Sequence, residues 1–396
     1  MFGGKHNLST RVRSNLEGIL RRQGRWKEAE ELAVKNLVVI EEIEGKDHAD
    51  TLIGVSKLAL VLQYQGKYKE AEGLNQRALK GREKALGIDH PQTLTSVSEL
   101  ASVLRDQGKY KEAEEINRRA LKGKEKVLGI DHPDTLTSVS NLALVLQDQG
   151  KYKEAEGMNR RALKGSEKAL GTDHPDTLTS VSNLALVLLY QGRYEAAEEI
   201  NRRALKGREK ALGTDHPDTL ISVSNQALVL YYQGKYEAAE EIYRRALKGN
   251  EEALGANHPN TLTSVNILAL VLQDQGKYKA AEVMYRRALK GREKVLGIDH
   301  PHTLISVYCL AYLLHHCHRY KEAIPLYQRA SSGFHGALGP DHRETRACLK
   351  HHASLKRFLD GEAPKDGIHE STDTHPTRLY SQVLSPSRAG SPSKNR

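Results

Sequence analysis

The amino-acid sequence predicts an all-α solenoid, a stack of helix-turn-helix units, and three observations support this prediction. Apolar residues recur with helical spacing, Gly and Pro separate the helical stretches, and a histidine returns every 42 residues. The histidine positions are His6, His48, His90, His132, His174, His216, His258 and His300, and His342 opens a partial ninth copy. A fixed period of this length is typical of repeat arrays in which each unit packs on its neighbours.

The first helix of each repeat is expected to follow the recurrent histidine. Pro175 suits a first helical position because it has no N–H to leave unpaired, and Asp176 suits the positive end of the helix dipole. Gly192 is expected to end the helix. One face of this predicted helix carries Leu178, Val181, Leu184, Ala185 and Leu188, at i, i+3 and i+4 spacing.

The second helix of the same repeat is expected to begin near Tyr194 and to run to Leu212-Gly213. Its buried side carries Ala197, Ile200, Ala204 and Leu205. A small residue recurs where the two helices must approach closely, at Ala71, Ala113, Ala155, Ala197, Ala239 and Ala281. A larger side chain there should overpack the joint by about 1–3 kcal/mol.

Composition limits the class of protein. Hydrophobic residues make up 38% of the 396 residues and aromatic residues 5%, which suits helix pairs that each bury one layer. No apolar run is long enough to span a membrane, and the opening six residues lack the apolar segment of a secretion signal. Cys309, Cys317 and Cys348 have no metal-like spacing. We expect a cytoplasmic protein with reduced thiols.

The net charge of +10 raises the alternative of a basic solenoid that binds nucleic acid. The placement of the charges argues against it, because Lys and Arg alternate with Glu and lack aromatic stacking partners. In Glu198-Glu199-Ile-Asn-Arg202-Arg203 each Glu precedes an Arg by four residues. This spacing predicts ion pairs along a solvated helix face.

Several residues carry a resemblance to a known family. Gly150, Tyr152, Ala155 and Ala162, preceded by Leu142-Ala143 and Leu146, resemble the signature of the tetratricopeptide repeat (TPR). The period of 42 residues and the joint from Arg203 to Pro217 resemble the kinesin light chain subtype, and the near-identical copies are similar to sensor arrays of fungal NOD-like signalling proteins. The resemblance implies a right-handed superhelix whose first helices line a concave groove for extended peptides.

The periodicity divides the chain into four parts. Residues 1–5 form an N-terminal extension, 6–341 eight repeats, 342–359 a capping helix and 360–396 a Ser/Pro-rich tail that we expect to be disordered. Both ends of the array are basic, which makes them candidate docking sites for acidic partners.

One pair of residues near the end of each first helix varies while the rest of that helix is nearly constant. Two interpretations remain open, a recognition surface on a constant scaffold or free drift at exposed positions. Tyr64, Tyr190, Tyr231 and Tyr232 favour recognition, because aromatic residues are preferred interface anchors. The pairs are Arg21-Arg22, Gln63-Tyr64, Arg105-Asp106, Gln147-Asp148, Leu189-Tyr190, Tyr231-Tyr232, Gln273-Asp274 and His315-His316.

Polar groups complete the candidate groove. Its asparagines are Asn15, Asn141, Asn183 and Asn225, at the position where the resemblance places an asparagine in carboxylate-binding TPR domains. The basic partners of such a clamp are approached only by Arg11 and Lys57, so a clamp for a C-terminal carboxylate has weak support.

No arrangement of side chains points to catalysis, a cofactor or a metal. The recurrent histidines are predicted to cap helices, because each stands one repeat away from the next. His315, His316, Cys317 and His318 form a tight cluster, but at the turn of a degenerate repeat. We therefore expect a non-catalytic adaptor for protein partners. The alternative is the sensor array of a NOD-like signalling NTPase, although no P-loop motif occurs in this sequence.

Overall fold

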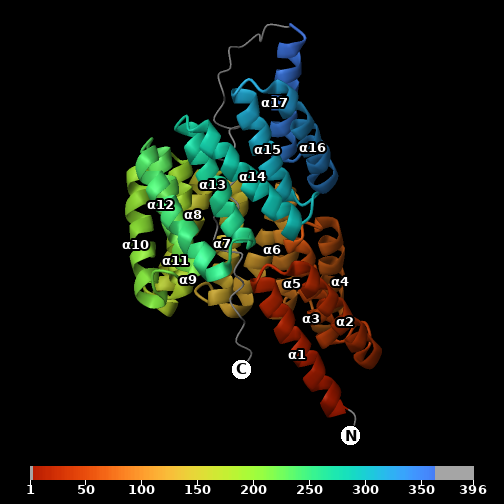
Figure 1. Cartoon of the computed structure of the whole chain (residues 1–396). Coiled ribbons are helices and arrows are strands. Elements are labelled where there is room, and N and C mark those ends of the chain that lie inside the picture. The colour runs from red at the N-terminus through yellow and green to blue at the C-terminus, as the bar shows by residue number, and fades with distance from the viewer. Residues whose placement is uncertain (1–2, 362–396) are drawn as a thin grey trace.

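The computed structural model describes residues 3–361, and within them seventeen α-helices and no strands are found (Figure 1). We call the odd-numbered helices A helices and the even-numbered ones B helices. The A helices are α1 (Gly3–Arg22), α3 (Ala49–Tyr64), α5 (Pro91–Asp106), α7 (Pro133–Asp148), α9 (Pro175–Tyr190), α11 (Pro217–Tyr232), α13 (Pro259–Asp274), α15 (Pro301–His316) and α17 (Arg343–Leu359). The B helices are α2 (Trp26–Glu44), α4 (Tyr68–Leu86), α6 (Tyr110–Leu128), α8 (Tyr152–Leu170), α10 (Tyr194–Leu212), α12 (Tyr236–Leu254), α14 (Tyr278–Val295) and α16 (Tyr320–Leu338).

The all-α solenoid predicted from the sequence is confirmed. Each A helix packs against the B helix that follows it, and each B helix packs against the next A helix. The tail expected beyond residue 361, with its Ser385-Pro386 and Ser391-Pro392 pairs, lies outside the described residues. Among residues 3–361 no helix is both long and apolar enough to cross a membrane.

The recurrent histidine caps the A helices α3 to α17, as predicted. In α7 the Nδ1 of His132 accepts a hydrogen bond from the N–H of Asp134 at 3.2 Å, and Pro133 occupies the first helical position. The prediction is wrong for the first repeat, where α1 begins at Gly3 and runs through His6. Asn7 follows His6 there, whereas proline follows the capping histidine in the six A helices from α5 to α15.

A tight turn joins each A helix to its B helix. After α9 the N–H of Gly192 donates a hydrogen bond to the carbonyl oxygen of Leu189 at 2.9 Å. The N–H of Arg193 donates one to the carbonyl oxygen of Leu188 at 3.0 Å. Gly192 has a φ of 76°, which a glycine adopts without steric cost. These bonds form a Schellman motif, so α10 begins at Tyr194 as predicted.

The two helices of a repeat touch at a glycine of the B helix. A Cβ on Gly165 of α8 would lie 2.5 Å from Cδ2 of Leu136 on α7. The recurrent alanines predicted to sit at the joint are also fully buried, Ala155 among them. The same close approach to an A-helix leucine recurs at Gly81, Gly123, Gly207, Gly249, Gly291 and Gly333.

Ion pairs join the outer surfaces of successive repeats. Arg161 contacts Glu125 of the preceding repeat at 2.5 Å, and Lys151 contacts Glu114 at 2.8 Å. Burial opposes ionisation of Glu114, but hydrogen bonds from Lys151 and Arg118 outweigh it and lower its pKa to about 2. Each exposed pair contributes only about 0–1 kcal/mol, but the pairs repeat along the array.

One predicted ion pair is corrected by this arrangement. Arg202 pairs with Glu198 four residues earlier, at 3.1 Å, as the spacing predicted. Arg203 instead pairs with Glu167 of the preceding repeat. Glu199 shares a helix face with Arg203, but the guanidinium bonds to the carboxylate of the neighbouring B helix α8 instead.

The array winds back onto itself after six repeats. The Nε2 of His258 lies 3.1 Å from the carbonyl oxygen of Arg22, and the Nε2 of His300 lies 3.0 Å from that of Tyr64. The turn at Gly24 touches Pro259, so the contact is close. Figure 1 shows the teal and blue helices returning over the red and orange ones.

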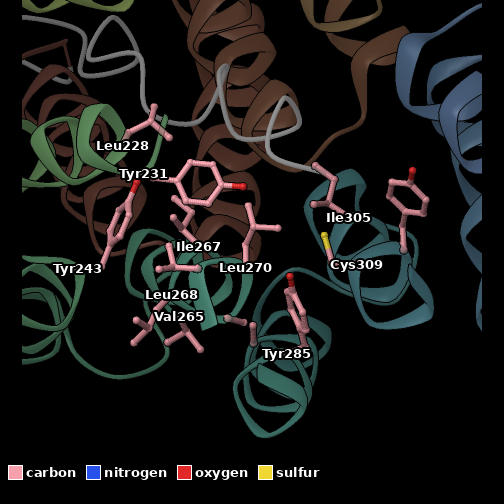
Figure 2. Packing of buried hydrophobic residues seen from close by; sticks show 14 of the residues in the cluster. Leu228, Tyr231, Tyr243, Val265, Ile267, Leu268, Leu270, Tyr285, Ile305 and Cys309 are labelled. Carbon is pink, nitrogen blue, oxygen red and sulfur yellow. The ribbon is translucent and has the colours of Figure 1, made fainter. Parts of the chain in front are cut away.

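The largest apolar cluster lies in the second half of the array (Figure 2). Tyr243 and Tyr285 are fully buried there, at the B-helix position that carries asparagine in earlier repeats, such as Asn201. Figure 2 places Tyr243 beside Leu228 and Tyr231, and Tyr285 near Leu270 and Cys309. Aromatic packing therefore replaces polar contacts toward the C-terminal end.

Two glycine substitutions in α8 test the importance of the helix joint. Gly157→Ala should stabilise the protein by about 0.5–1 kcal/mol, because Gly157 is exposed within a helix. Gly165→Ala gains the same helix propensity but overpacks Leu136, so it should be less stable than Gly157→Ala by about 1–3 kcal/mol. Urea unfolding followed by circular dichroism compares the two. Equal midpoints would show that the joint tolerates a methyl group.

Asparagine substitutions test the contact between turns. His258→Asn with His300→Asn keeps the helix caps, because asparagine is a good N-cap, but removes both cross-turn hydrogen bonds. Each bond contributes about 0.5–1.5 kcal/mol, so hydrogen exchange at the turns after α1 and α3 should become faster. His132→Asn with His174→Asn is the matched control, since these histidines cap helices without a cross-turn bond in the described residues. Unchanged exchange in the first double variant would contradict the proposed contact.

The cross-turn contact should also weaken in acid. Burial lowers the pKa of His258 below its ordinary value of 6.5, although the bond to the Arg22 carbonyl opposes the shift. The unfolded chain therefore binds the proton first, so the stabilisation is complete above pH 6.5 and is lost as the pH falls through the folded-state pKa. Hydrogen exchange at the turn after α1, measured between pH 7.5 and 5.5, should show this loss, and the His258→Asn variant should lack it.

Candidate protein-binding surface

The A helices form the inner wall of the superhelix. Consecutive A helices touch one another, as α9 touches α11 and α5 touches α7. The B helices pack mainly on the A helices beside them, and their ion pairs lie on the outside. The variable pairs and the asparagines predicted from the sequence all lie on A helices.

The variable pair couples neighbouring repeats. The first residue of a pair contacts the second residue of the pair in the next repeat. Gln63 Nε2, for example, donates a hydrogen bond to Asp106 Oδ2 at 2.8 Å. Arg105 Nε donates to Asp148 Oδ2 at 2.7 Å, and both side chains are nine-tenths buried. The hydroxyl of Tyr231 bonds to Asp274 in the same way. These pairs therefore form contacts between neighbouring repeats.

The tyrosines at the ends of A helices stack on the preceding repeat. Tyr190 stacks on Tyr152 with ring centroids 6.1 Å apart, and Tyr232 stacks on Tyr194 at 6.3 Å. Tyr64 lies 5.4 Å from Trp26, which replaces the usual tyrosine in the first repeat. These three tyrosines are half-buried, so each presents one part of its ring to the surface. Tyr231 differs, with 8% of its surface exposed.

The four predicted asparagines have different environments. Asn15 is exposed and Asn141 is half-buried, whereas Asn183 and Asn225 are buried with 1% and 2% exposure. The side-chain amide nitrogen and oxygen of Asn183 and of Asn225 have no hydrogen-bond partner in the described structure. Asn183 and Asn225 lie on α9 and α11, which touch each other.

Of the two basic residues expected for a carboxylate clamp, only Lys57 has a described side chain. Lys57 lies on α3 of the second repeat, where it lines a small cavity with Glu17. The carboxyl pKa of Glu17 is raised by burial, and nearby Arg21 and Lys57 oppose the rise. The side chain of Arg11 lies outside the part of the structure that is described.

The histidine cluster at the last turn contacts tyrosines. His318 Nδ1 lies 2.6 Å from the hydroxyl of Tyr320, and His315 Nδ1 lies 3.4 Å from that of Tyr327. Among residues 3–361 no three His, Cys, Asp or Glu side chains are grouped as metal ligands.

Sequence reasoning missed a set of buried cations on the B helices. Arg82 on α4, Arg208 on α10 and Arg292 on α14 share one repeat position and have 7%, 2% and 1% exposure. Each of these arginines is followed by Glu and Lys, and a run of charged residues on a helix usually indicates a face exposed to solvent. The residue at this position changes from repeat to repeat, from Arg82 to Lys124 and Ser166, whereas the surface charges stay constant. This variation is the signal in the sequence that distinguishes the buried position.

The helices and their inner wall define an α-solenoid of repeated helical hairpins that ends in a single A helix. Models of the tetratricopeptide repeat match residues 9–84, 51–126, 94–168, 134–210, 181–252 and 218–294, and a further model of the same repeat matches residues 268–335. The chain belongs to the tetratricopeptide repeat family. This confirms the resemblance seen in the sequence and places the chain among protein-interaction scaffolds, which are in general non-catalytic.

Several solved structures are similar to this chain. The nearly identical TPR-like repeats designated a kinesin light chain of Podosopora anserina are 25% identical and cover 51% of this chain and 95% of their own, with a TM-score of 0.44. BtubC (BKLC) from P. vanneervenii is 22% identical, with 60% and 92% covered and a TM-score of 0.47. The apo form of RapI is 17% identical, with 72% and 98% covered and a TM-score of 0.53, a likeness of fold alone. No curated protein matches the chain.

Proposed function

We propose that this chain is a non-catalytic adaptor whose inner A-helix wall holds an extended peptide segment of a partner protein. The observation that carries the proposal is the pair of buried, unpartnered side-chain amides of Asn183 and Asn225. A buried amide without a hydrogen bond costs about 1–3 kcal/mol, and a ligand that supplies the bonds recovers this energy.

A peptide backbone is the natural partner of these amides. Each asparagine offers a donor and an acceptor, which match the carbonyl and N–H of one peptide unit. Helices in contact, as α9 and α11 are, have axes about 8–10 Å apart. An extended chain advances about 3.3 Å per residue, so about three ligand residues separate the two asparagines.

Tyr190 and Tyr232 are the proposed side-chain anchors of the same two repeats. Each ends its A helix, and each is held by stacking on the tyrosine that begins the preceding B helix. A ring fixed in this way loses little entropy on binding, which favours it as an interface anchor. Asn15, Tyr64 and Asn141 extend the proposed surface toward the N-terminal repeats.

The charged residues support an adaptor more than the alternatives. Cations on the B helices pair with acids of the neighbouring repeat, as Lys168 does with Asp131 at 2.6 Å, so they form no continuous basic track for nucleic acid. No observation favours the sensor array of a signalling NTPase. Exposed Lys356 and Arg357 on α17 remain proposed contacts for acidic partners.

Two tyrosine substitutions test the proposal. Peptides selected from a random dodecapeptide display library by the native protein should bind the Tyr190→Ala, Tyr232→Ala variant at least about tenfold more weakly, a loss of about 1.4 kcal/mol. Fluorescence anisotropy with the labelled peptides measures the affinities, and circular dichroism checks the helical content.

Tyr278→Ala is the matched control, because Tyr278 is 45% exposed at the start of a B helix. It should leave the affinity unchanged. The proposal fails if the library yields no binder, or if both variants bind the selected peptides as tightly as the native protein does.

A further inference from the structure

We infer that a second copy of this chain docks head to tail on the first, through the same kind of contact that joins successive turns of the superhelix. Two edges form this contact. The loop edge consists of the capping histidine and the following residue at the start of each A helix, and the turn edge consists of the tight turn at the end of each A helix. The inference goes beyond the proposed peptide adaptor and does not depend on it.

The contact within the chain shows how the two edges fit. A Cβ on Gly66 of the turn edge would lie 2.5 Å from Cδ of Pro301, so the loop edge sits directly on the glycine. The Nε2 of His300 then lies 3.0 Å from the carbonyl oxygen of Tyr64. A side chain in place of the glycine would therefore hold the two edges apart. Close approaches of the same kind join Gly24 to Pro259 and Gly108 to His342.

This contact covers the loop edge wherever it forms. The side chain of His342 is 3% exposed, whereas those of His174 and His216 are 39% and 41% exposed. Pro301 is buried in the contact, whereas Pro133, at the same repeat position, is exposed. The uncovered loops therefore present to the surface an imidazole and a proline ring that the covered loops bury.

Both edges stay open over much of the array, although they keep the histidine and the glycine of the closed contact. A Cβ at the open turns would meet no atom of the described residues within 4 Å. Each chain therefore carries unused copies of both halves of one contact. The open turns are those at Gly150, Gly192, Gly234 and Gly276, and the capping histidines outside the contact are His48, His90, His132, His174 and His216.

Aromatic rings favour two of the open turns. At the closed turn after α3, the ring centroid of Trp26 lies 5.4 Å from that of Tyr64 and 5.9 Å from that of His300, so the incoming histidine packs beside an aromatic pair. The open turns after α9 and α11 therefore receive the loop edge of the second copy. Their aromatic pairs, at the same two repeat positions, are Tyr152 with Tyr190 and Tyr194 with Tyr232.

The loop edge and the turn edge differ, so the contact between copies is heterologous. A copy that uses its loop edge keeps its turn edge open for another copy. Because the superhelix advances along its axis, the contacts do not close into a ring, and the assembly grows with concentration. The intervening repeats hold the two edges of one chain at a high effective concentration, so contacts between separate chains need a higher protein concentration than the contact within one chain.

Multi-angle light scattering and sedimentation velocity of the full chain provide the test. The mass of the native protein should rise above 44.1 kDa as its concentration increases. Gly192→Asn with Gly234→Asn is the turn variant, because asparagine tolerates the φ of 76° at both glycines but places a side chain where the loop edge sits. It should self-associate at least about tenfold more weakly, with its helical content unchanged by circular dichroism.

His132→Asn, His174→Asn and His216→Asn together form the loop variant. Asparagine keeps the helix caps but lacks the ring nitrogen that reaches the turn, so this variant should also associate at least about tenfold more weakly. The turn variant keeps its loop edge, and the loop variant keeps its turn edge. An equimolar mixture should therefore form a 1:1 complex and nothing larger, as a head-to-tail contact requires.

A second measurement does not depend on the turn variant, in case that variant does not fold. An excess of the loop variant, added to the native protein, should bind at one end of each assembly and lower its mass. A native mass of 44.1 kDa at all concentrations up to about 1 mM overturns the inference and leaves both edges to another occupant. Assemblies that survive in both variants, or a mixture without a 1:1 complex, overturn it as well. The peptide adaptor is tested separately, by the affinities of the selected peptides.

Discussion

The close approach of two helices within each repeat is the constraint on which this structure depends. A glycine in the middle of a helix costs about 1 kcal/mol relative to alanine, yet Gly165 and its counterparts keep this position in seven repeats. The cost is offset because the leucine of the A helix lies directly on the glycine backbone, where a Cβ would stand 2.5 Å from Leu136. Because the joint recurs in seven consecutive repeats, small rotations between repeats add up to a regular superhelix.

The recurrent histidine shows how one residue acquires two roles in such an array. Its Nδ1 caps an A helix, and this role is the same in all repeats from His48 onward. Where six repeats complete the turn, the Nε2 of His258 and His300 meets a backbone carbonyl of the first repeats. The hydrogen on Nε2 is free for this contact because Nδ1 accepts the bond from the helix N–H.

Some differences between repeats lie on the A helices, where they act in pairs. Gln63 with Asp106 and Arg105 with Asp148 join one repeat to the next, so these positions are bound to one another as much as to any ligand. Arg208 lacks the acidic partner that Arg82 has in Glu99. A scaffold of near-identical units therefore obtains individual sites by changing a few facing residues, while its outer ion pairs stay the same.

The sequence by itself determined the helices, their caps, their order and the family, because these follow from local periodicity and from Gly and Pro at fixed positions. It also located the Asn183, Tyr190, Asn225 and Tyr232 positions on A helices. Only the tertiary structure decided that Arg203 pairs with Glu167, that Tyr231 is buried and that Arg208 lies between two A helices. Such contacts join residues of different helices, and the helical period specifies which face a residue occupies but not which neighbour stands opposite it.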